Sequence, residues 1–489
     1  MHLSALRLTA IYRLSVFTCI PAQQQDFLNF HLIKRNMSTS SPNSSNNRVL
    51  TVDTINPNVI TMEYAVRGPI VIRAVELEKE LENGTKLPFD RVIKANIGDA
   101  HAMGQTPITF IRQVIACTTD PSLLKTNLYP EDVKQKALSL LGACGGGSVG
   151  AYTQSNGIEL IRKHIAQFIE RRDKIFCDPD SICISGGASE AIRNVLKLFI
   201  HHDSSKKKAG IMVPIPQYPL YSASIEEFNL GQVGYFLEEE KNWALDLEEL
   251  ERSLKEHQTK FDVKVIVVIN PGNPTGQVLT KENIENIIKF AYKNNLFIFA
   301  DEVYQENVYA EGAKFYSFRK IMKEMGSPFD KLELASFYSC SKGYMGECGL
   351  RGGYVQFDNF DPQIAMDCIV DHPQPGDPSY NLWFEEKNAV LSSLNQRAKL
   401  VTESYNKIEG VHCQQVQGAI CSITWRTTRF FYAKKLLEET GICIVPGSGF
   451  GQRPNTWHFR TTILPQIELF NEMLVRFKTF HERFLASYK

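Results

Sequence analysis

The sequence predicts an α/β protein with a large, doubly wound, mainly parallel sheet domain and a smaller α+β domain. From about residue 180, short apolar segments alternate with segments of helical periodicity. One of these segments, VKVIVVIN (263–270), is largely β-branched and apolar, which is typical of strands covered on both faces. A chain of 489 residues is long enough for one such domain and a companion.

The expected elements follow one another in a regular order. Strands are predicted at 181–187, 209–215, 232–238, 263–270, 296–304 and 332–340. Helices are predicted at 188–202, 246–257 and 280–295, the last with Thr280 as its N-terminal cap. We expect residues 130–369 to form the large domain. Residues 49–129 and 370–489 are expected to build the smaller one, with strands near 419–425 and 442–446.

Residues 1–48 are expected to be a targeting or disordered leader, separate from both domains. The first 36 residues contain Arg7 and Arg13 and no acid before Asp26, a composition typical of a mitochondrial presequence. A secretory signal around LSVFTCIPA and a merely disordered leader are the alternatives. Met37 is an alternative start for a cytosolic form, and a flexible Ser/Asn-rich linker follows it.

Composition excludes several function classes. The 54 basic residues balance the 54 acidic residues, so no net charge attracts nucleic acid or an anionic membrane. The eleven cysteines contain no C-x-x-C pair or finger spacing, and the histidines show no metal-ligand spacing. We therefore expect neither a metal site nor a disulfide framework, and small molecules as partners.

Polar residues stand at the carboxyl ends of four of the predicted strands, at 187–189, 270–276, 301–304 and 339–342. Because parallel strands present their carboxyl ends at one rim, where ligands bind, these residues are expected to converge on one site.

The chemistry of these residues fits pyridoxal phosphate. A lysine at a strand end is suited to react with an aldehyde, which assigns that task to Lys342. The pyridine nitrogen needs a carboxylate (Asp301), and the phenolic oxygen needs donors (Asn273 and Tyr304). The phosphate needs helix-start amides, hydroxyls and an arginine. The sequence offers Ala188, Ser189, Ser339, Ser341 and Arg351.

Five motifs carry a family resemblance: SGGASEAI, PIPQYPLYSA, NPGNPTGQV, ADEVYQENVY and SCSKGYMGECGLRGG. Together they resemble fold-type I aminotransferases of class I and II over about residues 50–489. Simple members place the phosphate arginine eight residues after the lysine, where this chain has Leu350, with Arg351 one place later. That variant, with GGGSVGAYTQSNGI and DEVYQENVY, is similar to alanine aminotransferases in particular.

The resemblance implies further roles. Lys342 would hold the cofactor and move a proton, Tyr218 would stack on the ring, and Tyr152 would reach the phosphate of a neighbouring subunit in a homodimer. Arg460 in WHFRTTIL would bind the substrate α-carboxylate, with Asn273 and Gly98 beside the substrate. The Asn273–Pro274 bond is a candidate cis peptide.

The implied reaction is the exchange of an amino group between L-alanine and 2-oxoglutarate by a ping-pong mechanism. Three alternatives stay open: another specificity, such as a glyoxylate acceptor, a lyase of the aminocyclopropane-carboxylate synthase type, or a non-catalytic binding protein. GGGSVG (145–150) also matches a dinucleotide fingerprint, but the segment before it is predicted to be helical, whereas the fingerprint needs a strand there.

Overall fold

The computed structural model describes residues 49–51, 53–62, 68–96, 98–203, 205–360, 378–419, 421–425, 430–453 and 456–488. The expected presequence lies outside these residues. Residues up to Met62 belong to a separate unit, in which helix α3 (Pro57–Thr61) begins after Asn56, whose side chain accepts a hydrogen bond from the Asn58 N–H. All elements below belong to the unit that begins at Glu63.

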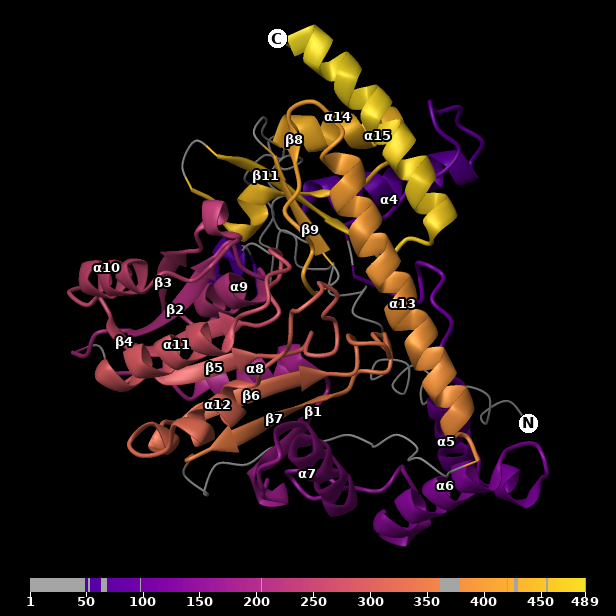
Figure 1. Ribbon diagram of the computed structural model, residues 1–489, viewed down its shortest axis with the longest axis vertical. Coiled ribbons are helices and arrows are strands. Elements are labelled where there is room, and N and C mark those ends of the chain that lie inside the picture. The colour runs from indigo at the N-terminus through magenta and orange to yellow at the C-terminus, as the bar shows by residue number, and fades with distance from the viewer. Residues whose placement is uncertain are drawn as a thin grey trace. The chain divides into compact units, whose positions relative to one another are not determined.

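A seven-stranded sheet, in the order β1-β7-β6-β5-β4-β2-β3, confirms the predicted α/β fold (Figure 1). Only β7 is antiparallel to its neighbours among these strands. The strands are β1 (Ile182–Ser185), β2 (Ala209–Ile215), β3 (Gly231–Phe236), β4 (Asp262–Ile269), β5 (Phe297–Asp301), β6 (Leu334–Ser339) and β7 (Gly353–Asp358).

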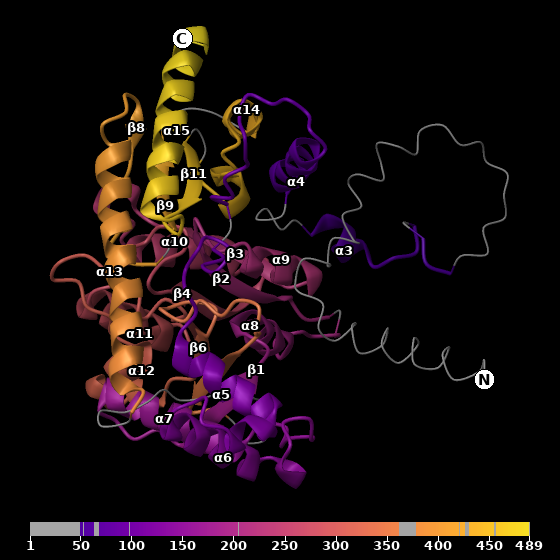
Figure 2. The ribbon, with the colours of Figure 1, turned by 90° about the vertical axis from the view of Figure 1, so that its right-hand side faces the viewer.

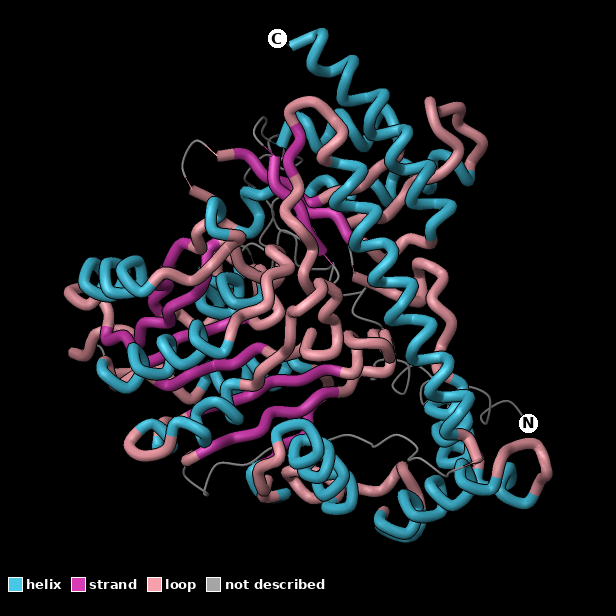
Figure 3. The backbone as a smooth tube through the Cα atoms, viewed as in Figure 1, coloured by secondary structure: helices cyan, strands magenta, loops and turns pink. Residues whose placement is uncertain are grey.

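The residues of β4 explain why helices cover both faces. Val265 and Val267 pack on one side of the sheet, and Ile266 and Val268 pack on the other, all of them buried. Successive side chains of a strand point to opposite faces, so this run needs two apolar layers. Figure 3 shows helices on both sides of the strands.

Two helices cover the first face, α8 (Ala188–Lys197) and α9 (Leu220–Glu227). The opposite face is covered by α7 (Glu159–Asp173), α10 (Leu247–His257), α11 (Lys281–Lys293) and α12 (Phe318–Met325). As predicted, α11 begins after Thr280, which forms a capping box with Asn283. The segment before GGGSVG is helix α6 (Glu131–Ala143), which confirms that a strand does not precede that motif.

A second sheet has the order β10-β11-β9-β8. Its strands are β8 (Val411–His412), β9 (Cys421–Trp425), β10 (Val445–Pro446) and β11 (Trp457–Thr462). Around it lie α4 (Pro69–Glu82), α14 (Phe430–Thr440) and α15 (Ile467–Tyr488) (Figure 2). The long helix α13 (Tyr380–Tyr405) contacts α5 (Thr109–Thr119) and also α15. Among the described helices, none has the length and apolarity that crossing a membrane requires.

Strand register brings the polar strand ends together. Gly353 of β7 pairs with Ser185 at the end of β1 and with Ser339 at the end of β6. Asp301 at the end of β5 lies between Ile269 of β4 and Phe337 of β6. The carboxyl ends of four strands therefore lie on one rim, as the sequence predicts.

Candidate active site

Asp301 ends β5 as a buried carboxylate with one oxygen satisfied. The residue is 3% exposed, and the Tyr221 hydroxyl donates a hydrogen bond of 2.9 Å to Oδ2. Oδ1 is buried and has no hydrogen-bond partner among the described residues. Burial raises the pKa of Asp301 to about 6, although the Tyr221 hydrogen bond, a hydrogen bond from the Val303 backbone and the Lys342 charge lower it. This oxygen is a ready acceptor for a protonated nitrogen.

Lys342 follows β6 in a turn beside Tyr304. Its Nζ lies 5.5 Å from the centroid of the Tyr304 ring, which is itself buried. The preceding turn is fixed by Ser339, whose Oγ accepts a hydrogen bond of 3.1 Å from the Ser341 N–H. The rim thus places the amine of Lys342 beside the Tyr304 phenol and near enough to Asp301 for its charge to lower the pKa of that carboxyl.

The start of α8 forms an anion-binding corner. Gly187 adopts φ 108°, and α8 begins at Ala188, with Ser189 next and no capping side chain. The Nη2 of Arg351 donates to the Gly186 carbonyl at 2.9 Å. A Cβ on Gly187 would lie 2.6 Å from that same nitrogen. Backbone N–H groups at a helix start and a guanidinium together favour a phosphate.

The offset of the arginine is accommodated by the backbone. Arg351 adopts φ 55°, a left-handed conformation, and its Nη1 donates to the Cys348 carbonyl at 2.9 Å. Leu350, which occupies the place of the arginine in simple members of the family, is 49% exposed. The turn therefore carries the guanidinium of Arg351, one residue later, to α8.

Arg460 of β11 reaches the rim from the smaller sheet. It is 4% exposed, and its Nη1 donates to Asn273 Oδ1 at 3.2 Å. Its Nη2 donates to the Asn96 carbonyl at 2.6 Å, and its guanidinium lies 4.7 Å from the centroid of the Phe450 ring. Nε is buried without a partner among the described residues. A buried guanidinium with an unsatisfied donor suits an anionic group of a substrate.

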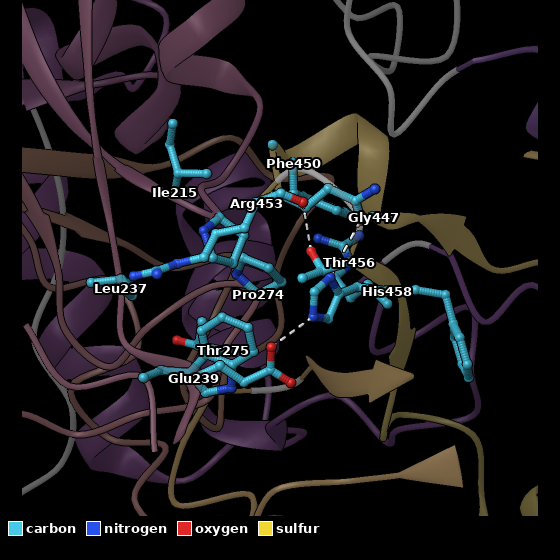
Figure 4. Close-up of a pocket in the computed structure, with 16 residues that line it drawn as sticks. Ile215, Leu237, Glu239, Pro274, Thr275, Gly447, Phe450, Arg453, Thr456 and His458 are labelled. Atoms are coloured by element: carbon cyan, nitrogen blue, oxygen red, sulfur yellow. Dashed lines mark hydrogen bonds and ion pairs between the residues drawn. The ribbon is translucent and has the colours of Figure 1, made fainter. Parts of the chain in front are cut away.

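A pocket adjoins Arg460 between β11 and the loops of the large sheet (Figure 4). Pro274 and Thr275 line it from one side, and Gly447 and Phe450 from the other. The Asn273–Pro274 bond is cis, as predicted. His458 joins the two sides, since its Nε2 lies 3.0 Å from Glu239 Oε2.

The remaining predicted residues differ in their surroundings. Gly98 is half-buried, and its carbonyl accepts a hydrogen bond of 3.6 Å from Cys348 Sγ, which also bonds the Ser341 carbonyl at 3.2 Å. Tyr218 is partly buried and packs against the core next to α9. Tyr152 is 105% exposed in this single chain and is not brought to the rim by its own fold.

Two residues of this site were not predicted from the sequence. Tyr221, the donor to Asp301, stands three places after Tyr218 in PQYPLY, and that helical spacing was an available signal. Asn96 contributes its backbone carbonyl to Arg460, and a backbone acceptor leaves no signal in residue type. The described residues hold no group of three His, Cys, Asp or Glu suited to a metal ion.

Comparison with known proteins agrees with this geometry. The family described as "Aminotransferase class I and II" matches residues 113–372. The chain is 51% identical to alanine aminotransferase 2 of Xenopus laevis over 485 residues, which cover 92% of this chain and 90% of the relative. It is 40% identical to "Probable alanine aminotransferase, mitochondrial" of Dictyostelium discoideum over 497 residues, 92% of each chain.

Among solved structures, the fold is similar to that of the alanine aminotransferase from Pyrococcus furiosus. The TM-score is 0.68 at 22% identity, with 88% of this chain and 100% of the other covered. Family match, sequence identity and fold agree over most of the chain. The chain therefore belongs to the aminotransferase class I and II family, in which its similar relatives are alanine aminotransferases.

Proposed function

We propose that this protein is a pyridoxal phosphate-dependent alanine aminotransferase, which moves the amino group of L-alanine to 2-oxoglutarate. The observation that carries the proposal is the rim itself: buried Asp301 has an unsatisfied Oδ1, and the charge of Lys342 acts on the same carboxylate. The identity of 51% to a relative named alanine aminotransferase 2 supports the choice of substrate.

The residues present fit pyridoxal phosphate. Oδ1 of Asp301 would accept the N–H of the pyridine ring, and Asn273 and Tyr304 would face its phenolic oxygen. The corner formed by Arg351 and the start of α8 would hold the phosphate. The other residues assigned to the phosphate and the ring are Ala188, Ser189, Tyr218, Ser339 and Ser341.

When bound, pyridoxal phosphate supplies an aldehyde that reacts with amines and a ring that accepts electrons. The chain's own residues do the rest. Arg460 would bind the carboxylate of L-alanine, with Asn273 and Gly98 beside the substrate, and so orient the Cα–H bond. The Nζ of Lys342 would take the Cα proton, while Asp301 would keep the ring nitrogen protonated.

Two half-reactions follow from this arrangement. In the first, L-alanine leaves as pyruvate and its amino group stays on the enzyme. In the second, 2-oxoglutarate takes that amino group and leaves as L-glutamate. One buried guanidinium, Arg460, would serve the carboxylate next to the reacting carbon of each substrate in turn.

Assembly and location belong to the same proposal. The fully exposed Tyr152 is suited to contact the phosphate of a second copy, which supports a homodimer. The presequence-like residues 1–36 and the mitochondrial relative from Dictyostelium discoideum support a mitochondrial location, with a cytosolic form from Met37. Residues 130–369 would form the cofactor domain, and residues 49–129 and 370–489 the smaller one.

An absorption spectrum of the purified protein, recorded before and after addition of L-alanine, tests the proposal. A pH-sensitive visible band should move to shorter wavelength with alanine and return with 2-oxoglutarate. A visible band that does not move on addition of alanine would support the assignment of the cofactor but contradict L-alanine as the substrate. Absence of any visible band after reconstitution with pyridoxal phosphate would contradict the whole proposal.

Replacing Lys342 by Ala tests the role of the amine. We expect steady-state transamination to be lost while pyridoxal phosphate still binds, because its phosphate and ring contacts remain. Equal amounts of pyruvate and glutamate from the parent enzyme would distinguish transamination from a lyase reaction, which expels a leaving group instead. Undiminished turnover by Lys342→Ala would refute the mechanism.

A further inference from the structure

Asn307 contacts the backbone that follows Lys342 and is fully buried, at 0% exposure. Its Oδ1 accepts a hydrogen bond of 2.9 Å from the N–H of Gly343, the residue that follows Lys342. Its Nδ2 donates to the carbonyl of the same Gly343 at 3.3 Å. One carboxamide therefore contacts both polar groups of a single backbone residue, with its oxygen as the acceptor and its nitrogen as the donor.

These two bonds hold two successive peptide planes. The Gly343 N–H belongs to the peptide that joins Lys342 to Gly343, and the Gly343 carbonyl belongs to the next peptide. Gly343 adopts φ 66°, and a Cβ there would lie 2.6 Å from Glu306 Oε2. The backbone immediately after Lys342 is thus held in a left-handed conformation that few other residues adopt.

Asn307 is itself fixed by its neighbours. Its N–H donates to the Tyr304 carbonyl at 2.8 Å, and its carbonyl accepts from the Ala419 N–H at 2.9 Å. Its Nδ2 also donates to the Tyr309 hydroxyl at 2.8 Å. Through these bonds, Asn307 joins the turn that carries Tyr304 to the turn that carries Lys342.

We propose that Asn307 is a positioning residue for Lys342, whose carboxamide sets the backbone from which the Lys342 amine reaches the space beside Tyr304. This inference rests on the proposed function, in which that amine moves the substrate proton. Asn307 does not touch substrate, so its effect is expected on the rate of proton transfer and not on substrate binding.

Asn307→Ala tests the inference, with Asn406→Ala as its matched control. Asn406 makes the same double contact, at 2.8 and 2.9 Å, with the backbone of Cys413 in the smaller domain. We expect Asn307→Ala to lower kcat about 100-fold with KM for L-alanine unchanged. Asn406→Ala should keep the parent kcat.

Hydrogen exchange supplies a readout that does not depend on activity. In the full chain loaded with pyridoxal phosphate, the Gly343 amide should exchange faster in Asn307→Ala than in the parent or in Asn406→Ala. A conservative variant, Asn307→Asp, keeps the acceptor for the Gly343 N–H and loses the donor. Its kcat should therefore lie between that of Asn307→Ala and that of the parent. It also serves if Asn307→Ala fails to fold.

A free amine separates positioning of Lys342 from a general structural effect. Added methylamine is expected to supply the missing base in Lys342→Ala, and a diffusing amine does not need Asn307. The amine-restored rate should therefore be the same in Lys342→Ala and in Lys342→Ala/Asn307→Ala. If Asn307→Ala lowered the rate by the same factor in the parent and in the amine-restored Lys342→Ala variant, the inference would be overturned.

The failure of each proposal is distinguishable. If Lys342→Ala alone keeps full transamination, the proposed function fails and the inference falls with it. If Lys342→Ala is inactive while the Asn307 variants keep the parent kcat and the parent exchange rate at Gly343, only the inference fails.

Discussion

The charged form of the Asp301 carboxylate is costly for the folded protein. Desolvation disfavours it, and the Tyr221 hydroxyl, the Val303 backbone and the Lys342 charge compensate for only part of that loss, so the pKa is raised to about 6. A protonated ring nitrogen at Oδ1 would reverse the balance, because an opposite charge favours the ionised carboxylate. Asp301 thus makes the protein without pyridoxal phosphate less stable and would make binding of that cofactor more favourable.

This reasoning gives a pH prediction for Asp301→Asn in protein freed of pyridoxal phosphate. Well below pH 3.8 the carboxyl is protonated in both the folded and the unfolded states and does not affect stability. As the pH rises from about 4 to 6, only the unfolded chain ionises freely, so the parent loses up to ~3 kcal/mol that the variant keeps.

Urea unfolding at pH 4 and pH 7 measures this difference. The free energy of unfolding of Asp301→Asn should exceed that of the parent by a larger amount at pH 7 than at pH 4. Tyr221→Phe keeps the Asp301 carboxyl and serves as the control, because it should retain the loss of stability with rising pH that Asp301→Asn removes. An unchanged difference between the two pH values would contradict the assigned pKa.

Residue chemistry was readable from the sequence where a side chain acts by its own type. Lys342 follows a strand, Asp301 ends one, and both carry groups whose chemistry suggests a cofactor. Asn96 was not found because it acts through its backbone carbonyl, and Asn307 was not found because its side chain bonds the backbone of the distant Gly343. A polar residue bound to backbone looks, in sequence, like any other polar residue.

At the scale of elements, the anion-binding corner at the start of α8 depends on the close approach of β7 to α8. A Cβ on Gly353 would lie 2.8 Å from the Ala188 nitrogen and 2.6 Å from the Tyr338 carbonyl oxygen. Both are backbone atoms, so an added methyl group would displace the strand or the helix.

Gly353→Ala should therefore weaken both stability and cofactor binding. We expect a loss of ~1–3 kcal/mol in unfolding free energy, as for overpacked sites, and a higher Kd for pyridoxal phosphate. Gly349→Ala is the matched control, since a Cβ at Gly349 meets nothing within 4 Å. Equal Kd values for the two variants would contradict this role of the approach.

Most strands of the large sheet and three of the helices that cover it, α8, α10 and α11, were predicted close to their observed positions, because apolar periodicity reports burial, whereas α7, α9 and α12 were not predicted. The sequence analysis placed no strand at β7, whose GGYVQF segment follows directly on the glycine-rich turn after Lys342. β5 also ends at Asp301, three residues before the predicted end, because the chain turns there to place Tyr304. Turn geometry of this kind is set by tertiary contacts and not by periodicity.

At the scale of the molecule, the order of strands and helices was sufficient to predict a mainly parallel α/β sheet. The four-stranded sheet was only partly predicted: the strands expected near 419–425 and 442–446 correspond to β9 and β10, whereas β8 and β11 were not predicted. β8 is two residues long, and a segment this short carries no measurable alternation. The pairing of β11 with β9 and β10, which delivers Arg460, arises only from long-range contacts.

The proposed homodimer predicts complementation between inactive chains. If Tyr152 serves the neighbouring site, a mixed dimer of Lys342→Ala and Tyr152→Ala chains contains one site with native Lys342 and native Tyr152. Co-expression of the two variants should therefore yield more activity than the sum of the separate variants. Chains purified separately and mixed without subunit exchange are the control. Absence of any gain in verified mixed dimers would place Tyr152 in its own subunit.

The segment around Gly418 has a consequence for how this protein can be divided. Its N–H donates to the Gly276 carbonyl at 2.8 Å, and the neighbouring Gln417 carbonyl accepts from the Tyr309 N–H at 2.7 Å. A Cβ on Gly418 would lie 2.5 Å from the Asn307 carbonyl oxygen, so the segment is inserted tightly between the loops of the large sheet. Neither sheet is a transferable module: exchange of the C-terminal region between relatives would succeed only if the loops at 276–278 and 307–309 were exchanged with it.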